Sequence, residues 1–283
     1  MSVGKQAYDT GDYREAVSQY THALDAAGTL EPQDKRVTDT LSRLAEAHLN
    51  LGEMAEAEEL YRRALPLQRK LTGVDSEQVA TILQNLGSIY QDVGRVDEAE
   101  AAYNEALKMR ETVLGLDHPE YADTLVNFAS LRRQMGHDAE AEDLNKRALA
   151  LCQKAKQLRC VATVFDNLGS LYFEKGRLDE ALDVYSKGRA TWVTIGGKEH
   201  LDYAISTANL ARVYTQLKRY KDAEPLLKET LPIFEMAYGQ DGAPLAGYYK
   251  GYARLLTNLN RSDEAEVYER KATAIDALNS QLK

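Results

Sequence analysis

The chain has few residues of several kinds, and each shortage excludes a class of protein. Only two of its 283 residues are cysteine, so no disulfide framework is expected to hold the chain together. Lysine and arginine (35) are outnumbered by aspartate and glutamate (44), and the net charge of −9 argues against a general nucleic-acid binder. No apolar run approaches the roughly 20 residues that span a bilayer, and residues 1–20 lack the apolar core of a signal peptide. These absences predict a cytoplasmic protein without membrane insertion.

Motifs that carry catalysis or bind metals are missing as well. The five histidines lie without the spacing of metal ligands, and the sequence has neither H-E-x-x-H, C-x-x-C nor a phosphate-binding glycine motif. Carboxylates are plentiful, but many lie at the starts of predicted helices, where they complement the helix dipole. We therefore predict no catalytic residue, no metal site, no cofactor and no enzymatic activity. Cys152 and Cys160 are expected to be buried free thiols, with a redox role as the alternative.

What the chain does contain is a repeat of 42 residues. The small residue that begins the second half of each repeat recurs at Ala57, Ala99, Ala141, Ala181, Ala223 and Ala265. These positions differ by 42, 42, 40, 42 and 42 residues, so one repeat is two residues shorter than the rest. A fixed period of this length indicates an array of stacked units, and such arrays mostly form binding surfaces.

Each repeat is predicted to be a pair of helices. Within residues 80–92 the apolar side chains recur at spacings of three and four, and Gly94 supplies a residue that can end the helix. We predict an all-α fold, a right-handed α-solenoid of about seven antiparallel helix pairs that form a single domain. Its expected repeats cover residues 1–37 (a truncated first unit), 38–79, 80–121, 122–161, 162–203, 204–245 and 246–283.

The repeat motifs resemble those of the tetratricopeptide repeat (TPR) family. L-G-x-x-Y followed by A-x-x-x-Y occurs at Leu86–Tyr90 with Ala99–Tyr103 and at Leu168–Tyr172 with Ala181–Tyr185. The usual unit of the family has ~34 residues, and the longer unit here, with L-G-x-D-H-P between units, is similar to the kinesin-light-chain subtype. The resemblance implies a superhelix with a binding groove, but it implies no particular partner.

An asparagine precedes the repeat leucine in four successive units: Asn85, Asn127, Asn167 and Asn209. Because an amide both donates and accepts, a row of asparagines can bond the backbone of an extended peptide. In the TPR family the asparagine at this place commonly contacts a bound peptide, and the resemblance implies the same role here. The alternative is that each asparagine bonds a neighbouring helix and only stabilises the stack.

The charge of the same face changes along the chain. The residues three positions after the asparagines, with the cations nearby, are Ser88, Ser130, Ser170, Arg212, Arg254, Arg133 and Lys250. Positions toward the start of the chain are acidic, so we expect a partner that brings acidic side chains or a free carboxylate to the basic end. The alternative is that these charges are solvated. Phe173 is a candidate aromatic anchor for the partner, or packs against the next unit.

The leading hypothesis is a non-enzymatic protein–protein interaction scaffold that binds a peptide or helical segment of a partner protein in the concave groove. The alternative is a self-associating structural or regulatory array whose groove docks a helix of the same or another copy. The first repeat lacks half of its first helix. We therefore expect the chain to be a piece of a larger protein whose upstream part could carry a targeting sequence.

Overall fold

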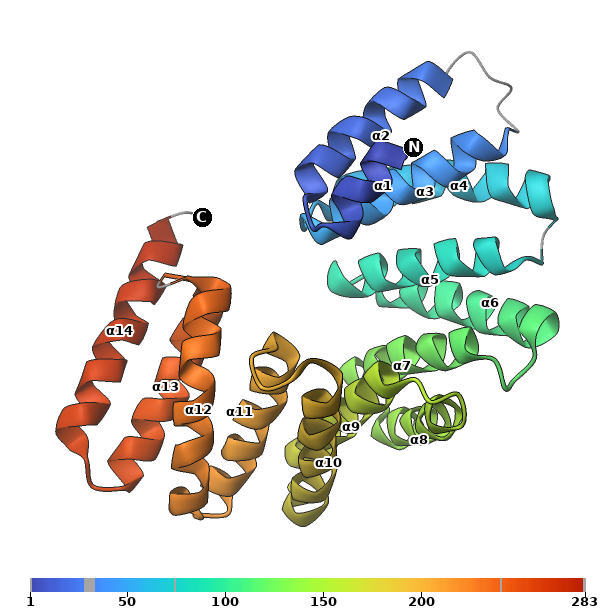
Figure 1. Cartoon of the computed structure of the whole chain (residues 1–283). Helices are drawn as coiled ribbons and strands as arrows, with labels where there is room; N and C mark the ends of the chain where they lie inside the picture. The colour runs from blue at the N-terminus through green and yellow to red at the C-terminus, as the bar shows by residue number, and fades with distance from the viewer. Residues whose placement is uncertain (1, 28–33, 74, 240, 282–283) are drawn as a thin grey trace. The chain divides into compact units, whose positions relative to one another are not determined.

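A computed structural model describes residues 2–27, 34–73, 75–239 and 241–281. These residues form fourteen α-helices and no strand (Figure 1). The prediction of an all-α repeat fold built from about seven helix pairs is confirmed. The chain divides into two compact units, Met1–Leu151 and Cys152–Lys283, which are described separately.

The first unit contains the helices from α1 to most of α8. Their bounds are α1 (Ser2–Asp9), α2 (Tyr13–Ala27), α3 (Lys35–Asn50), α4 (Met54–Thr72), α5 (Glu77–Asp92), α6 (Val96–Leu114), α7 (Pro119–Gln134) and α8 (Asp138–Lys154). From α1 to α7 each helix packs against the next one in the chain. Contacts are therefore local in sequence, as the repeat period predicts.

The second unit contains the remaining six helices of the described ranges. Their bounds are α9 (Leu158–Glu174), α10 (Leu178–Gly196), α11 (Leu201–Gln216), α12 (Tyr220–Tyr238), α13 (Ala243–Asn258) and α14 (Ser262–Gln281). Each of these helices again packs against its successor. No helix in the described parts of either unit is both long and apolar enough to cross a membrane.

Between the two helices of a pair, the chain turns through one residue in the left-handed conformation. In the third pair this residue is Gly94 (φ 78°), and the following N–H, of Arg95, donates to the Tyr90 carbonyl at 2.8 Å. Lys218 and Asn260 adopt the same conformation with φ of 59°, although it costs a residue with a side chain about 1–2 kcal/mol. The turn is therefore kept even where the glycine is replaced.

Tyrosines of the second helices fill the space inside the pairs. Tyr103 is fully buried, and a Cβ added to Gly87 would lie 2.8 Å from its ring. Gly169 and Tyr185 repeat this close approach at 2.7 Å. In the fourth pair the tyrosine position holds Asn145, which is 3% exposed and whose Oδ1 has no hydrogen-bond partner in the described part of the chain. The fourth pair therefore lacks the ring that fills this space in the third and fifth pairs.

Arginines link several pairs to the preceding one. Arg95 forms an ion pair with Glu58 of the preceding pair at 2.8 Å and lies over the ring of Tyr90, 4.3 Å from its centroid. In the fourth pair a cation occupies the position of that tyrosine: Arg132 stands 42 residues after Tyr90 and pairs with Glu100 at 2.7 Å. The link between these neighbouring pairs is thus preserved, although its arginine stands five residues earlier in the fourth repeat than in the third.

The two cysteines are not free thiols. Cys152, in the last turn of α8, forms a disulfide with Cys160, in the first turn of α9, and their Cα atoms are 5.9 Å apart. The expectation of buried free thiols is therefore wrong. The physical reason is the short junction between these helices, where Lys156 turns the chain with a φ of 57° and brings the two cysteines within disulfide distance.

Candidate functional site

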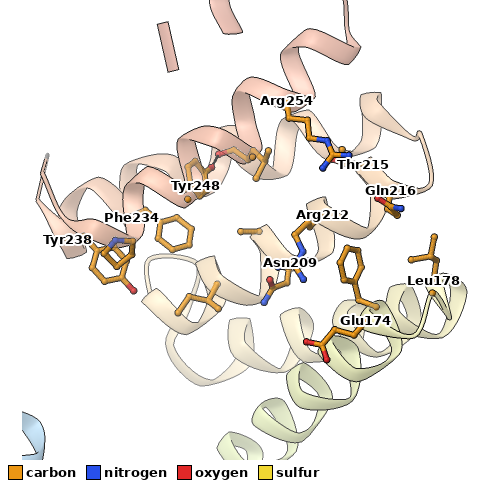
Figure 2. A pocket seen from close by; sticks show the side chains of 18 residues that line it. Glu174, Leu178, Asn209, Arg212, Thr215, Gln216, Phe234, Tyr238, Tyr248 and Arg254 are labelled. Carbon is orange, nitrogen blue, oxygen red and sulfur yellow. Dashed lines mark hydrogen bonds between the residues drawn. The ribbon is translucent and has the colours of Figure 1, made fainter. Parts of the chain in front are cut away.

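A groove of about 840 Å³ lies in the second unit. Its walls come from α11, α12 and α13, with the end of α9 and the start of α10. Figure 2 shows Phe234, Tyr238 and Tyr248 toward one end of the groove, and Arg212 and Arg254 toward the other. The groove therefore has an aromatic part and a cationic part.

The aromatic part is held in place by contacts among its own side chains. The Tyr248 hydroxyl donates to the Leu227 carbonyl and lies 3.0 Å from the Thr230 hydroxyl. The ring of Phe234 lies 4.8 Å from that of Tyr248 and 6.0 Å from that of Tyr238, measured between centroids. Burial raises the pKa of Tyr248, so its hydroxyl stays neutral and keeps its hydrogen bonds. These contacts give a fixed apolar wall.

The cationic part contains two arginines in the same register of successive repeats. The guanidinium of Arg212 stacks on the ring of Phe173, 4.3 Å from its centroid. Arg212 and Arg254 are both exposed, and neither has a carboxylate within ion-pair distance among the described residues. By contrast, Arg261 in the same unit pairs with both Glu224 and Glu264. The two groove guanidinium groups are thus available to a ligand.

The α13 wall of the groove is bare backbone at two places. Gly247 and Gly251 lie one helical turn apart, and a Cβ added to either would meet no atom within 4 Å. A glycine inside a helix costs about 0.5–1 kcal/mol relative to alanine. No packing contact among the described residues requires a glycine at either position, in contrast to Gly87 and Gly169.

The groove gathers four of the residues predicted from the sequence: Phe173, Asn209, Arg212 and Arg254. Lys250 is not among them, because its ammonium group lies 2.7 Å from the Asp276 carboxylate of α14. Asn167 and Ser170 belong to α9 but do not line the groove. The remaining predicted residues lie in the first unit: Asn85, Asn127, Ser88, Ser130 and Arg133.

Several of the predicted polar residues make hydrogen bonds inside the chain. The Asn85 amide donates to the Tyr61 hydroxyl at 2.8 Å, in agreement with the alternative that the asparagines stabilise the stack. Ser88 bonds the Tyr103 hydroxyl at 3.0 Å. The same contact joins Ser170 to the Tyr185 hydroxyl at 2.9 Å, and Ser130 accepts from the Gln91 amide at 3.2 Å. Contact between this row and a bound peptide stays a prediction.

Sequence reasoning missed the aromatic wall and the two glycines. Phe234 and Tyr248 resemble ordinary core residues in the sequence, because apolar periodicity alone does not tell a groove wall from a packed interface. The spacing of Gly247 and Gly251 was a usable signal, since helix interiors disfavour glycine and both fall in the first half of the last predicted repeat, residues 246–283. Within the described ranges, no three His, Cys, Asp or Glu side chains come together as metal ligands could.

The repeats match a family model. A model described as tetratricopeptide repeat matches residues 36–112, 80–154 and 160–236, which together make up more than half of the chain. The chain belongs to the tetratricopeptide repeat family. The resemblance predicted from the L-G-x-x-Y and A-x-x-x-Y motifs is confirmed. TPR folds generally act as protein–protein interaction scaffolds and are generally not enzymes, so the broad class of the predicted function is supported.

Solved structures share this TPR fold. BtubC (BKLC) from P. vanneervenii is 24% identical with a TM-score of 0.67, covering 80% of this chain and 92% of that one. The kinesin-light-chain TPR-like repeats of Podosopora anserina are 21% identical with a TM-score of 0.58, covering 75% and 100%. RapI in its apo form is 14% identical with a TM-score of 0.74, covering 98% and 96%. At these identities the likeness shows the fold alone.

Two curated relatives match part of the chain. The clustered mitochondria protein homolog of Meyerozyma guilliermondii is 28% identical over 129 residues, which are 45% of this chain and 10% of the relative. The homolog of Candida albicans is 26% identical over 125 residues, 44% of this chain and 9% of the relative. The matched segment thus spans about a tenth of the length of these relatives.

Proposed function

We propose that this TPR chain is a protein–protein interaction scaffold whose second unit binds a carboxylate-bearing peptide or helical segment of a partner protein. The binding site is the groove bounded by α11, α12 and α13. Phe234 and Tyr248 offer apolar surface to the partner, and Arg212 and Arg254 offer charge-assisted hydrogen bonds to its carboxylates.

The observation that carries this proposal is the pair of guanidinium groups in one groove without a carboxylate partner among the described residues. The chain has a net charge of −9, and Arg95, Arg110 and Arg261 all have carboxylate partners. An arginine that is left unpaired in an acidic chain, inside a hollow of about 840 Å³, supports an acidic ligand.

The test uses peptides selected from a random displayed library against the full chain. Affinities of the selected peptides are then measured by calorimetry for the native chain and for the double variant R212E/R254E. We expect the selected peptides to be rich in Asp and Glu, and the variant to bind them at least about tenfold more weakly. The matched control is R270E, since Arg270 pairs with Glu266 on α14 outside the groove. Peptides without acidic residues that bind the double variant as tightly as the native chain would contradict the proposal.

Two further measurements identify the kind of ligand that the groove binds. Amidation of the carboxyl terminus of a selected peptide weakens binding only if the groove takes a free carboxylate rather than acidic side chains. Light scattering over a concentration series tests the self-associating alternative. We expect a molecular mass that does not change with concentration. If the mass of the native chain rises with concentration and that of R212E/R254E does not, the groove binds another copy of the chain.

We propose a cytoplasmic location for the scaffold, as the sequence predicts. Cytosolic thiols are kept reduced, whereas disulfides persist in oxidising compartments. The protein is isolated from its native source with thiols blocked during lysis. An intact Cys152–Cys160 disulfide in that material would count against the cytoplasm, and two blocked thiols would support it.

A further inference from the structure

We propose that the occupant of the groove is an amphipathic α-helix of a partner protein, seated across Gly247 and Gly251 of α13. The inference rests on the proposed function, because it takes the groove with Arg212 and Arg254 as the binding site. It adds the conformation of the bound segment, which the family resemblance leaves open between an extended peptide and a helix.

Backbone hydrogen bonding favours a helix over an extended chain. An extended segment that is buried in the groove needs partners for its own N–H and C=O groups. On the α13 side the wall at Gly247 and Gly251 is helical backbone, whose polar groups are already bonded within the helix. Asn209 is the single member of the asparagine row that lines the groove. A helix satisfies its own backbone and needs only apolar contact and a few charges.

The two glycines fit the close approach of a second helix. The distance between packed helices is about 8–10 Å and depends on the side chains at the contact. Gly247 and Gly251 lie on one face of α13, and the space beyond both is open. A ligand helix can therefore approach the α13 backbone there more closely than an alanine or leucine would permit. The open side of these glycines faces the same hollow that holds the unpaired arginines.

The charges and rings also define the pattern of the bound helix. Its apolar face lies over Phe234 and Tyr248, at the end of the groove where Figure 2 places these rings. Its carboxylates reach Arg212 and Arg254, which lie 42 residues apart in the chain and occupy equivalent places in successive repeats. The partner is thus a helix with an apolar stripe that is flanked by Asp or Glu.

The experiment compares two displayed peptide libraries of matched composition against the full chain. In one library the random positions lie on the outer face of a stable helical scaffold, and in the other, prolines prevent helix formation. We expect acid-bearing binders from the helical library, with affinities that fall in R212E/R254E.

The glycines are then tested with one selected helical binder. G247A/G251A should raise the thermal midpoint by a few degrees, because alanine favours the helix more than glycine does. The same variant should bind the helix about fivefold or more weakly, because the added methyl groups occupy the contact. G247L should abolish binding. The matched control is K250A, on the same helix but directed at Asp276 of α14. A purely structural role for the glycines does not predict greater stability together with weaker binding.

Each outcome separates the two proposals. Acid-bearing binders that come only from the proline library and depend on Arg212 and Arg254 overturn the helix but leave the proposed function standing. The helix proposal is also overturned if G247A/G251A and G247L bind the selected helices as tightly as the native chain does. Absence of acid-bearing binders from both libraries, or indifference to R212E/R254E, overturns the proposed function itself. Dimerisation that G247L abolishes would make the occupant a second copy of the chain.

Discussion

Replacing Asp166 with asparagine should remove a pH-dependent loss of unfolding free energy from the second unit. The Asp166 carboxylate accepts from the Trp192 indole N–H at 2.7 Å and from the Ser206 hydroxyl at 2.6 Å. Burial raises the pKa of Asp166 to about 6; the two hydrogen bonds oppose this rise, and the nearby charge of Asp202 adds to it. The carboxylate is thus ionised at neutral pH against the preference of its surroundings.

The size of the effect follows from the difference in pKa between the folded and unfolded states. The pKa rises from 3.8 to about 6, or roughly two units, and each unit corresponds to 1.36 kcal/mol, so the upper bound is about 3 kcal/mol. The pKa of Asp166 is higher in the folded state than in the unfolded state. The contribution of protonated Asp166 to the free energy of unfolding is therefore fully present below pH 3.8. It is lost as the pH rises through about 6. The residual solvent exposure of Asp166 reduces the observed value below that bound.

The assay is urea unfolding followed by Trp192 fluorescence at several pH values between 4 and 7.5, since Trp192 is the only tryptophan. In D166N the amide oxygen can accept from Trp192 and the amide N–H can donate to Ser206, so both hydrogen bonds are retained. The difference in unfolding free energy, D166N minus native, should therefore grow in favour of D166N between pH 4 and 7. D183N is the control, because Asp183 is exposed and pairs with Lys187. A difference that does not change with pH would refute the assignment of a desolvated carboxylate.

Three further predictions concern packing and covalent structure. Gly87→Ala should lower the unfolding free energy by about 1–3 kcal/mol in a melt followed by circular dichroism, because the new Cβ would lie 2.8 Å from the Tyr103 ring. Arg110→Met should cost up to about 3–5 kcal/mol in the same assay, since Arg110 is 1% exposed and its loss leaves the buried Thr124 and the partly buried Glu77 without their guanidinium partner. Maleimide should label no thiol in the recombinant protein purified under oxidising conditions and two after reduction in denaturant, because Cys152 and Cys160 are joined.

Local patterns in the sequence were sufficient to predict the helix pairs. The 42-residue period fixes which small residues meet at the helix crossings, and Ala99 and Ala181 are both fully buried as this predicts. The turn at Gly94 follows from glycine's tolerance of positive φ. These features depend on residues close in the chain, so a single sequence contains enough information to predict them.

The groove depends on contacts that a repeat pattern does not encode. Phe173 and Arg212 come from different helix pairs, and their stacking at 4.3 Å follows from how α9 and α11 pack. Lys250 shares the predicted face but pairs with Asp276, because α14 offers a carboxylate where the pattern predicted contact with a partner. The disulfide was missed for a related reason, since the two-residue shortening was read as a change of spacing and not as a closer approach of two helix ends.

The register that places the arginines in the groove also shows which repeats use the same position for a hydrogen bond to a tyrosine. Ser88 and Ser170 each form a hydrogen bond with the tyrosine fifteen residues later. In those repeats the serine position is therefore occupied by a hydrogen bond inside the helix pair. The residues fifteen positions after Arg212 and Arg254 are Leu227 and Glu269, so neither arginine has a tyrosine at the position that bonds the serines. The last two repeats thus lack the tyrosine and carry an arginine, whereas the fourth repeat has Asn145 at the tyrosine position and keeps Ser130. The surface that we propose for binding is therefore formed where the repeats of this chain differ, and not by the features that they share.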